Sequence, residues 1–328
     1  MSVGIVVIGR NEGPRLERAL ASARDAGCPV LYVDSGSSDG SVAQATALRV
    51  PVHELDPARP LSAARARNEG AAWLLAAHPE TRFVQFLDGD CVLAHGWIAH
   101  AAGVLDAHPE CAAVIGQVLE RDAGASAYNR LCALEWRSAP GELTNFGALG
   151  GIAMMRAAVF QALGGFRPEV IAGEDSELGV RMALAGHTVR KLDHPMATHD
   201  AGMTRFAQWW TRAVRGGHAI GQRFALNGGA PARDCAREHA STLFWGAGLP
   251  LAILASVIPT RGASLAVLLA YPLLAARVWW TRRRMGDTPG DALLYALFIV
   301  PTKFANALGL LRYYLNRSAN RYRIIEYK

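Results

Sequence analysis

Residues 83–90 read Phe83-Val84-Gln85-Phe86-Leu87-Asp88-Gly89-Asp90, and this stretch decides the fold expected for the chain. A short apolar run ends abruptly in two carboxylates, which is typical of a strand buried in a parallel sheet with polar chemistry at its carboxyl end. Asp88 and Asp90 should lie on the same side of an extended segment, because strand side chains alternate. Two oxygen ligands at such an edge suit Mg²⁺ or Mn²⁺ and a diphosphate. Such triplets also occur in solvated turns, so the surrounding sequence has to decide between the two.

Composition narrows the class of protein. The chain has 328 residues, of which 51% are hydrophobic and 19% charged, with a mean hydropathy of +0.12 and a formal net charge of +6. A basic chain favours nucleic acid, anionic lipid or a phosphorylated substrate as its partner. The sequence has no zinc-finger spacing and no Lys/Arg-rich helix, so we expect no nucleic acid to bind.

Cysteine usage and the N-terminus indicate the compartment. The five cysteines are scattered, without a Cys-x-x-Cys pair, which fits reduced thiols in the cytosol better than a disulfide framework. Residues 1–8 lack the basic start and long apolar core of a signal peptide and are typical of a first strand. We therefore expect the catalytic part to be cytosolic.

Residues 1–120 alternate apolar runs with helical patterns. Strands are expected at Val3–Ile8, Val30–Val33, Phe83–Leu87 and Ala112–Val118, and helices at Gly13–Arg24, Ser41–Leu48, Ser62–Ala77 and Trp97–His108. This alternation implies βαβ units and a mostly parallel sheet. Polar segments follow three of the strands, at Arg10–Glu12, Asp34–Asp39 and Asp88–Asp90. The carboxyl ends of parallel strands should bring these segments together at one edge.

Residues 241–328 differ from the preceding part of the chain in containing long apolar runs. Thr242–Pro259 and Gly262–Trp280 are nearly continuous apolar runs, each about long enough to cross hydrocarbon, and Arg261 separates them. We expect a transmembrane helical hairpin over residues 241–281. The arginines at 282–284 follow two tryptophans, and this aromatic and basic border should lie on the cytosolic side.

Residues 290–328 contain a third apolar run, Ala292–Leu311, which is interrupted by Pro301 and Lys303. If this run crossed the membrane, the basic tail after it would face outward, against the positive-inside rule. We therefore expect an interfacial amphipathic helix and a basic tail in contact with anionic lipid. The alternative for all three runs is a set of helices in a soluble core.

Six short motifs occur in a fixed order over the first 175 residues. They are Arg10-Asn11-Glu12, the run from Val33-Asp34 to Ser41, Ala66-Arg67-Asn68 with Gly70, Leu87-Asp88-Gly89-Asp90, Gly164-Gly165-Phe166 and Gly173-Glu174-Asp175. In these motifs the chain resembles the family-2 glycosyltransferases, which are inverting enzymes of GT-A fold. It departs from the family at Gly9-Arg10, where Thr or Ala and then Tyr or Phe are more usual.

The later sequence resembles a membrane-linked bacterial subgroup often encoded with exopolysaccharide genes. The resemblance rests on His199-Asp200, on Gln208-Trp209-Trp210 with Arg212, on Gly217-His218-Ala219 and on the tail Ile324–Lys328. It implies an α/β fold, with a Rossmann-like GT-A catalytic domain over residues 1–230 and C-terminal membrane helices. Within that domain, residues 1–120 would bind the nucleotide and residues 121–230 the acceptor.

The activity implied by the resemblance is metal-dependent transfer of a hexosyl or related sugar from a nucleotide-sugar, with a UDP-sugar favoured. The acceptor would be a lipid-linked sugar or another glycan, in exopolysaccharide or cell-surface glycan assembly. The enzyme would lie at the cytoplasmic (inner) membrane with its catalytic domain in the cytosol. Two crossings are too few for a polysaccharide channel, so secretion would require separate export proteins as partners.

The resemblance also assigns roles to the donor side. Asp34 would accept a hydrogen bond from the base, Glu12 and Arg67 would touch the nucleotide, and Asp88 would face the ribose or sugar. Asp34 also fits an Asx turn, and Asp39 fits a cap for the following helix. Asp90, with Asp88, would hold Mn²⁺ or Mg²⁺. His199 is a candidate third ligand that would favour Mn²⁺, and otherwise a histidine bonded to backbone near a turn.

The remaining roles concern the acceptor. Asp175 is the expected catalytic base, with Glu174 as the competing assignment, and a carboxylate at a helix N-terminus is the structural alternative. Gln208, Trp209, Trp210 and Arg212 are expected to bind the acceptor, through stacking on sugar and a charged contact to phosphate. The same residues would also suit an amphipathic helix at a lipid border.

Other functions compete with this interpretation. A sugar-nucleotide nucleotidyltransferase usually has a Gly-rich, basic first loop, of which residues 9–13 are a poor version. A dehydrogenase is disfavoured because no Gly-x-Gly-x-x-Gly follows the first strand. An inactive membrane subunit that assists a partner is disfavoured by the presence of both Asp90 and Asp175.

Overall fold

The computed structural model describes residues 2–143, 149–319 and 321. The chain divides into two compact units. The sheet unit comprises Met1–Asp122 and Trp136–Ala201, and the helical unit comprises Ala123–Glu135 and Gly202–Lys328. The boundary differs from the one expected at residue 230, because residues 202–230 and a short earlier helix group with the C-terminal helices rather than with the sheet.

The first half of the sheet unit is a parallel sheet. Its strands are β1 (Val3–Gly9), β2 (Val30–Asp34), β3 (Val52–Glu54) and β4 (Phe83–Asp88), in the order β3-β2-β1-β4. The connecting helices are α1 (Pro14–Asp25), α2 (Ser41–Ala47) and α3 (Ala63–Ala77). All three strand pairings are parallel, so the expected mostly parallel central sheet is confirmed. The three-residue strand β3 was not expected from the sequence.

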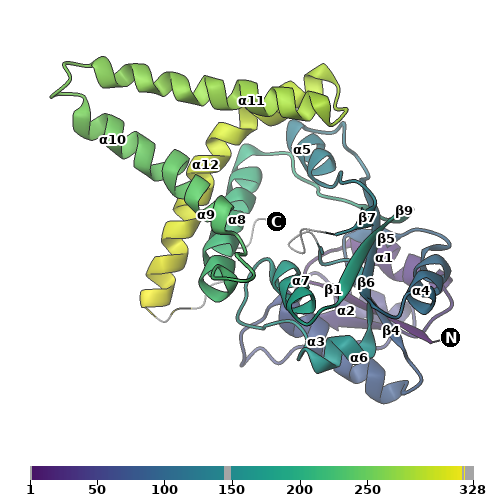
Figure 1. Ribbon diagram of the computed structural model, residues 1–328. Helices are drawn as coiled ribbons and strands as arrows, with labels where there is room; N and C mark the ends of the chain where they lie inside the picture. Colours follow the sequence, from purple (N-terminus) through teal and green to yellow (C-terminus); the bar gives the residue numbers. More distant parts are fainter. Residues whose placement is uncertain (1, 144–148, 320, 322–328) are drawn as a thin grey trace. The chain divides into compact units, whose positions relative to one another are not determined.

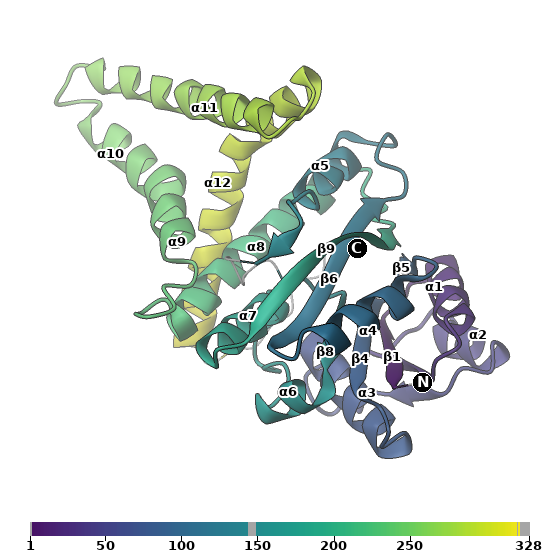
Figure 2. The same ribbon diagram turned by 45° about the vertical axis from the view of Figure 1, so that its right-hand side comes forward.

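The second half of the sheet is mixed. It adds β5 (Cys91–Leu93), β6 (Cys111–Glu120), β7 (Gly141–Glu142), β8 (Ala153–Arg156) and β9 (Thr188–His199), with helices α4 (Trp97–Ala107), α6 (Ala157–Ala162) and α7 (Glu174–Leu184). β8 is antiparallel to both β4 and β6, whereas β6 and β9 are parallel and run side by side (Figure 2). β5 pairs antiparallel with the end of β9, and this pairing sets Cys91 opposite His199.

Strand β1 is buried along nearly its whole length, as the continuous apolar sequence predicts for a strand covered on both faces. Helix α3 approaches it closely because position 70 is glycine. A Cβ atom there would lie 2.5 Å from Val6 Cγ1 and 2.8 Å from Val33 Cγ2. This close packing places the N-terminal half of α3, with Arg65, Arg67 and Asn68, beside the sheet.

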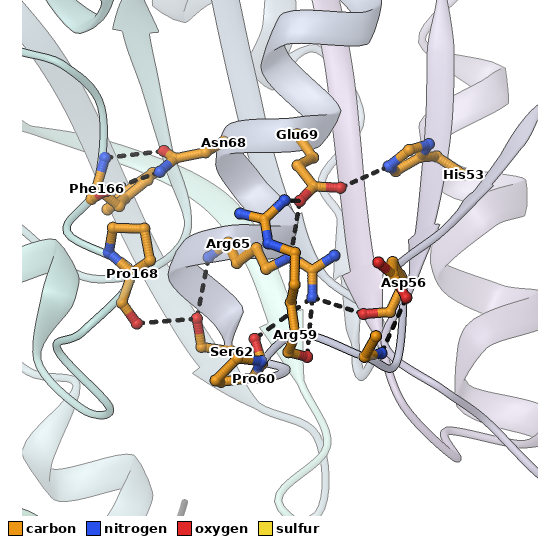
Figure 3. A network of polar contacts seen from close by, with 11 residues as sticks. His53, Asp56, Arg59, Pro60, Ser62, Arg65, Asn68, Glu69, Phe166 and Pro168 are labelled. Atoms are coloured by element: carbon orange, nitrogen blue, oxygen red, sulfur yellow. Dashed lines mark hydrogen bonds and ion pairs between the residues drawn. The ribbon is translucent and has the colours of Figure 1, made fainter. Parts of the chain in front are cut away.

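Polar side chains on α3 tie the helix to two loops (Figure 3). The amide of Asn68 donates to the Phe166 carbonyl (2.7 Å) and accepts from the Phe166 N–H (2.9 Å). Ser62 caps the helix by accepting from the Arg65 N–H, and its hydroxyl donates to the Pro168 carbonyl. The buried Arg65 donates to the carbonyls of Asp56 and Arg59 and to Glu69. Helix α3 therefore fixes both the loop before it and the turn around Phe166.

The helical unit consists of a series of helices joined mostly by short turns (Figure 1). They are α5 (Ala127–Glu135), α8 (Phe206–Asn227), α9 (Ala236–Leu243), the π-helical η2 (Phe244–Gly248), α10 (Leu249–Ser256), the 3₁₀-helical η3 (Ala263–Leu269), α11 (Ala270–Arg284) and α12 (Pro289–Ser318). Arg130 of α5 donates two hydrogen bonds of 2.6 Å to Asp291, which anchors α5 to the start of α12.

Helices α8 and α12 pack backbone against backbone through glycines. A Cβ atom at Gly217 would lie 2.1 Å from the Asn306 carbonyl oxygen, and one at Gly309 would lie 1.9 Å from the Val214 carbonyl oxygen. Small residues at such spacing let two helices approach closely, a packing mode that is common between membrane helices.

Two segments of the described chain are long and apolar enough to cross a membrane, Ala263–Arg284 and Pro289–Ser318. The hairpin expected over residues 241–281 thus corresponds to the segment Ala263–Arg284 and a first arm in which α9, η2 and α10 follow one another without a break from Ala236 to Ser256. The interfacial placement expected for 290–328 stays a prediction. Ile324–Lys328 and Arg323 of the basic tail lie outside the described residues.

The basic border at 282–284 is only partly a surface feature. Arg282 is buried and pairs with Asp287, and its guanidinium lies 4.4 Å from the centre of the Tyr295 ring. It also donates to the Leu134 carbonyl. Arg282 therefore holds the turn between α11 and α12, and Arg283 contributes by donating to the Asp287 carbonyl. The Arg284 guanidinium lies 5.4 Å from the centre of the Trp280 ring.

Candidate active site

The loops after β1 and β2 are bonded to each other. Asn11 has a positive φ of 55°, and its side-chain oxygen accepts from the Ser38 N–H (2.7 Å) while its own N–H donates to Ser37 Oγ. Asp39 accepts from the Gly13 N–H with one oxygen and from Ser41 with the other. The N-cap of α2 is Gly40, and Asp39 bonds the first N–H of the helix from the position before it. The first two polar segments lie together at the carboxyl edge of the sheet.

Asp34 is buried at the end of β2, where its carboxylate organises the turn that follows. One oxygen accepts from Tyr32 Oη (2.8 Å), and the other accepts from the N–H groups of Gly36 and Ser37. Three of roughly four lone-pair positions of a carboxylate are thus in use. The bonds from Gly36 and Ser37 form the Asx turn that is the alternative role of Asp34. A hydrogen bond from a nucleotide base to Asp34 remains a prediction.

Glu12 lies against the central motif. A Cβ atom added at Gly89 would sit 3.2 Å from Glu12 Cγ, and one added at Gly9 would sit 3.3 Å from the same atom. The Glu12 carboxylate pairs with Arg15 at 3.1 Å. The glycine between Asp88 and Asp90 therefore makes room for the Glu12 side chain, and a contact of Glu12 with the nucleotide stays a prediction.

Arg67 joins three of the predicted motifs. From α3, one of its nitrogens donates to Asp88 Oδ1 at the end of β4 and the other to Glu174 Oε1 at the start of α7, both at 2.6 Å. Burial alone would lower the pKa of Arg67, but the charges of Asp88, Glu174 and Asp175 outweigh it and hold the pKa above its usual range. Gly151 lies against this cluster, since a Cβ there would meet Arg67 Nη2 at 2.3 Å.

The two candidate bases differ in surroundings. Glu174 is buried and is engaged by Arg67, whereas Asp175 is half-buried and follows it in the first turn of α7. The helix begins at Glu174, so both carboxylates also benefit from the positive end of the helix dipole. Glu174 is therefore held by Arg67, and the choice of Asp175 over Glu174 as the base stays a prediction.

Asp90 and His199 meet although 109 positions separate them in the sequence. Asp90 is buried after β4, and its Oδ2 lies 3.5 Å from His199 Nε2 at the end of β9. The other ring nitrogen, Nδ1, lies 2.7 Å from Glu120 Oε2. Burial opposes a charge on the His199 imidazole, but hydrogen bonds with Asp90 and Glu120 outweigh it and raise its pKa to about 9.

The donor set at this point fits a divalent cation. Ligand atoms of Asp90, Cys91 and His199 all lie within 4.8 Å of one another. A carboxylate oxygen and an imidazole nitrogen are an acceptable pair for Mn²⁺. Asp88 lies outside this group and is bonded to Arg67 instead. Of the three expected ligands, Asp90 and His199 are therefore brought together, while Asp88 is held toward α3.

The expected acceptor-binding residues lie in the helical unit. Gln208 caps α8, because its side chain accepts from the N–H groups of Thr204 and Arg205. Trp209 is only 4% exposed and packs edge-on against Phe298, which gives it a packing role instead of an open face for sugar. Trp210 is half-buried, and Arg212 pairs with Glu135 at 2.7 Å.

Sequence reasoning missed three residues of the sheet unit. Glu120, Cys91 and Gly151 each touch a predicted site residue. Of these three, only Glu120 could have been found from the sequence, because it is a carboxylate at the end of a long apolar strand, as Asp88 is.

Comparison with known proteins agrees with this architecture. The family model described as glycosyl transferase family 2 matches residues 4–164. The mannosyltransferase PcManGT from Pyrobaculum calidifontis, solved with GDP-Man and Mn²⁺, is 18% identical with a TM-score of 0.63, over 96% of this chain and 88% of that one. No curated protein matches the chain in sequence.

A second structural relative is TarS of S. aureus. Its residues 1–349, solved with UDP, are 16% identical with a TM-score of 0.51, over 98% of this chain and 93% of that one. The chain spans 44% of a longer structure of the same protein.

The fold and the family match together define the class. The sheet unit has the GT-A fold, and the polar edge of its sheet is the place where such folds bind ligands. Residues 4–164, which include β1 to β4, belong to glycosyl transferase family 2.

Proposed function

We propose that this chain is an inverting glycosyltransferase that moves a sugar from a nucleotide-sugar, with a UDP-sugar favoured, to a lipid-linked or glycan acceptor in exopolysaccharide or cell-surface glycan assembly. The observation that supports this most directly is the convergence of distant motifs in the sheet unit. Asp90 meets His199, while Arg67 connects Asp88 to the start of α7. The candidate cation ligands and the start of α7, where the candidate base lies, are thus each held by a polar cluster of the sheet unit.

The charged side chains at the edge of the sheet indicate how the nucleotide-sugar donor would be bound. Asp90 and His199 would hold Mn²⁺ or Mg²⁺, which would offset the negative charge that develops on the leaving diphosphate. Asp88, fixed by Arg67, would orient the ribose or the sugar. The related structures support a nucleotide-linked sugar as donor, since TarS was solved with UDP and PcManGT with GDP-Man and Mn²⁺.

Asp175 would act as the base. The acceptor hydroxyl gives its proton to the Asp175 carboxylate as its oxygen bonds to the anomeric carbon. The bond from that carbon to the diphosphate oxygen breaks at the same time, and the nucleoside diphosphate leaves with the electron pair. Attack from the face opposite the leaving group inverts the anomeric centre. Glu174 would keep Arg67 in place and so hold the donor side to α7.

The helical unit would hold the enzyme at the cytosolic side of the membrane. Large apolar side chains on the hairpin are strongly exposed, among them Leu254 (70%), Ile258 (85%) and Leu273 (68%). Contiguous exposed apolar surface of this kind suits lipid. Helix α12, which packs along α8, would lie in the interface, because the basic tail after it would otherwise face outward.

Trp210 and Arg212 would serve an acceptor that is carried on lipid. A tryptophan face stacks on sugar, and Arg212, released from its exposed partner Glu135, would contact a diphosphate. Trp209 and Gln208 would support this element from behind by packing and capping.

The test is an assay of the purified full chain with a panel of nucleotide-sugars and Mn²⁺. A glycosyltransferase releases a nucleoside diphosphate and transfers sugar to a polyprenyl-diphosphate sugar better than to the free sugar. A parallel assay supplies a nucleoside triphosphate and a sugar 1-phosphate, and release of pyrophosphate from that pair would indicate the nucleotidyltransferase alternative. No turnover with any donor, together with no donor binding, would indicate the inactive membrane subunit. Equal transfer to lipid-linked and free sugar would remove the lipid carrier from the proposal.

A further inference from the structure

Glu120 is a buried carboxylate whose two oxygens have separate partners. It is the last residue of β6, and its side chain has no exposed surface. Oε2 lies 2.7 Å from His199 Nδ1, and Oε1 accepts from the Ala201 N–H at 2.9 Å. The backbone register of β6 and β9 also pairs Glu120 with His199. The position of this carboxylate is therefore set by the sheet.

This arrangement determines which nitrogen of His199 is available. A carboxylate that accepts from Nδ1–H keeps the proton on that nitrogen, so the lone pair of the neutral ring is on Nε2. Nε2 is the nitrogen that lies 3.5 Å from Asp90 Oδ2. The Trp136 ring packs against the imidazole with a centroid distance of 5.3 Å and restricts its rotation.

We propose that Glu120 is a positioning residue that makes His199 Nε2 a cation ligand and so gives the site its preference for Mn²⁺ over Mg²⁺. This inference rests on the proposed function, in which Asp90 and His199 hold the cation. Mg²⁺ relies on oxygen ligands and a nitrogen ligand adds little to its affinity, whereas Mn²⁺ accepts imidazole more readily. Loss of the imidazole tautomer with its lone pair on Nε2 should therefore weaken Mn²⁺ binding more than Mg²⁺ binding.

The geometry makes Glu120→Gln a sharp probe. If the amide oxygen keeps the bond from the Ala201 N–H, the NH₂ group faces His199 Nδ1 and donates to it. The ring proton then moves to Nε2, where it points toward Asp90 and occupies the ligand position. If the amide turns over, its NH₂ group faces the Ala201 N–H, and two donors are opposed. Neither orientation satisfies both contacts, although the side chain keeps its size.

The experiment measures Mn²⁺ and Mg²⁺ affinity of the purified full chain with saturating UDP, using electron paramagnetic resonance of free Mn²⁺ and competition by Mg²⁺. We expect E120Q to weaken Mn²⁺ binding by about 10–100-fold, as loss of an outer partner of a ligating histidine generally does, and to weaken Mg²⁺ binding much less. E177Q is the matched control, because Glu177 is also fully buried but pairs with Arg181 on α7. It should leave both affinities unchanged.

The outcomes distinguish a failure of the Glu120 role from a failure of the proposed cation site. Wild-type Mn²⁺ affinity in E120Q would overturn the role of Glu120 while leaving the cation site intact. An equal loss of Mn²⁺ and Mg²⁺ affinity would also overturn it, since general damage to the site affects both ions. If the wild type itself shows no saturable Mn²⁺ binding and Asp90→Ala changes nothing, the cation part of the proposed function fails, and the role of Glu120 fails with it.

Discussion

The sheet unit and the helical unit differ in which side chains they bury and which they leave exposed. The sheet unit buries charge at one edge and gives it specific partners, as in Arg67 between Asp88 and Glu174 or His199 between Asp90 and Glu120. The helical unit packs α8 on α12 through glycines and leaves large apolar side chains of the hairpin exposed. The first arrangement is suited to charged ligands and the second to lipid.

The largest effect is expected at the candidate base. Asp175→Asn should lower sugar transfer by about 10²–10⁴-fold, because an amide cannot take the proton of the acceptor hydroxyl. Binding of the nucleotide-sugar should change little, since Asp90 and His199 are untouched. Steady-state transfer and donor titration on the same preparation measure the two effects. Near-normal turnover in this variant would mean that the base lies elsewhere.

The next largest effect is expected at Arg67, the arginine that pairs with Asp88 and Glu174, and it concerns the stability of the sheet unit. Arg67→Met leaves Asp88 and Glu174 without their partner, and breaking a buried ion pair generally costs about 3–5 kcal/mol in the free energy of unfolding. Arg59→Met is the control, because that side chain is 65% exposed and its pair with Glu69 is 3.6 Å long. Denaturant unfolding compares the two, and similar small changes would show that the Arg67 network is not structural.

Acid should affect the helical unit through His218. The ring is buried against Tyr313, and Nδ1 has no hydrogen-bond partner among the described residues. Burial, with the charge of Arg215, lowers its pKa to about 4 from 6.5. The unfolded chain then takes up the proton first as the pH falls. The neutral ring therefore gives full stability above pH 6.5, which is lost between about pH 6.5 and 4.

The size of this loss follows from linkage and approaches roughly 3 kcal/mol once the pH is below the folded pKa. His218→Leu cannot be protonated and should reduce the difference in melting temperature between pH 7 and pH 4.5. Melting curves by circular dichroism measure it. The same acid sensitivity in wild type and variant would exclude His218 as its source.

Close packing of α8 and α12 predicts the smallest effect. Gly309→Ala adds a methyl group where the Val214 carbonyl oxygen is 1.9 Å away, so the helices must separate, at a cost of about 1–3 kcal/mol. Gly290→Ala, in the first turn of the same helix, meets nothing within 4 Å and should be neutral or slightly stabilising. Thermal unfolding of both variants shows whether the glycine contact is needed.

Much of the sheet unit could be predicted from the sequence, because its signals are local. Apolar runs and helical periods fix β1, β2, β4, α1 and α3, and polar residues directly after strands mark the ligand edge. The role of Glu120 could not be predicted, since it depends on the register of β6 against β9, two strands that are distant in sequence.

The helical unit was harder to predict because the relevant contacts are between helices. The pattern at 208–212 is equally typical of an acceptor site and of a buried helix face. Only packing on Phe298 shows that Trp209 is internal, and only the pairing with Glu135 shows where Arg212 lies. The boundary near residue 202 likewise depends on α8 packing with α12, which no local pattern indicates.

The central claim is that the carboxyl edge of the sheet binds a nucleotide-sugar through a divalent cation held by Asp90. Calorimetric titration of UDP into the full chain, with and without Mn²⁺, tests it directly. Mn²⁺ should strengthen UDP binding about tenfold or more in the wild type, the size expected for one charge-assisted contact to the diphosphate. It should have no such effect in Asp90→Ala. UDP binding that is the same with and without Mn²⁺, or a wild-type Mn²⁺ effect in the Asp90 variant, would contradict the claim.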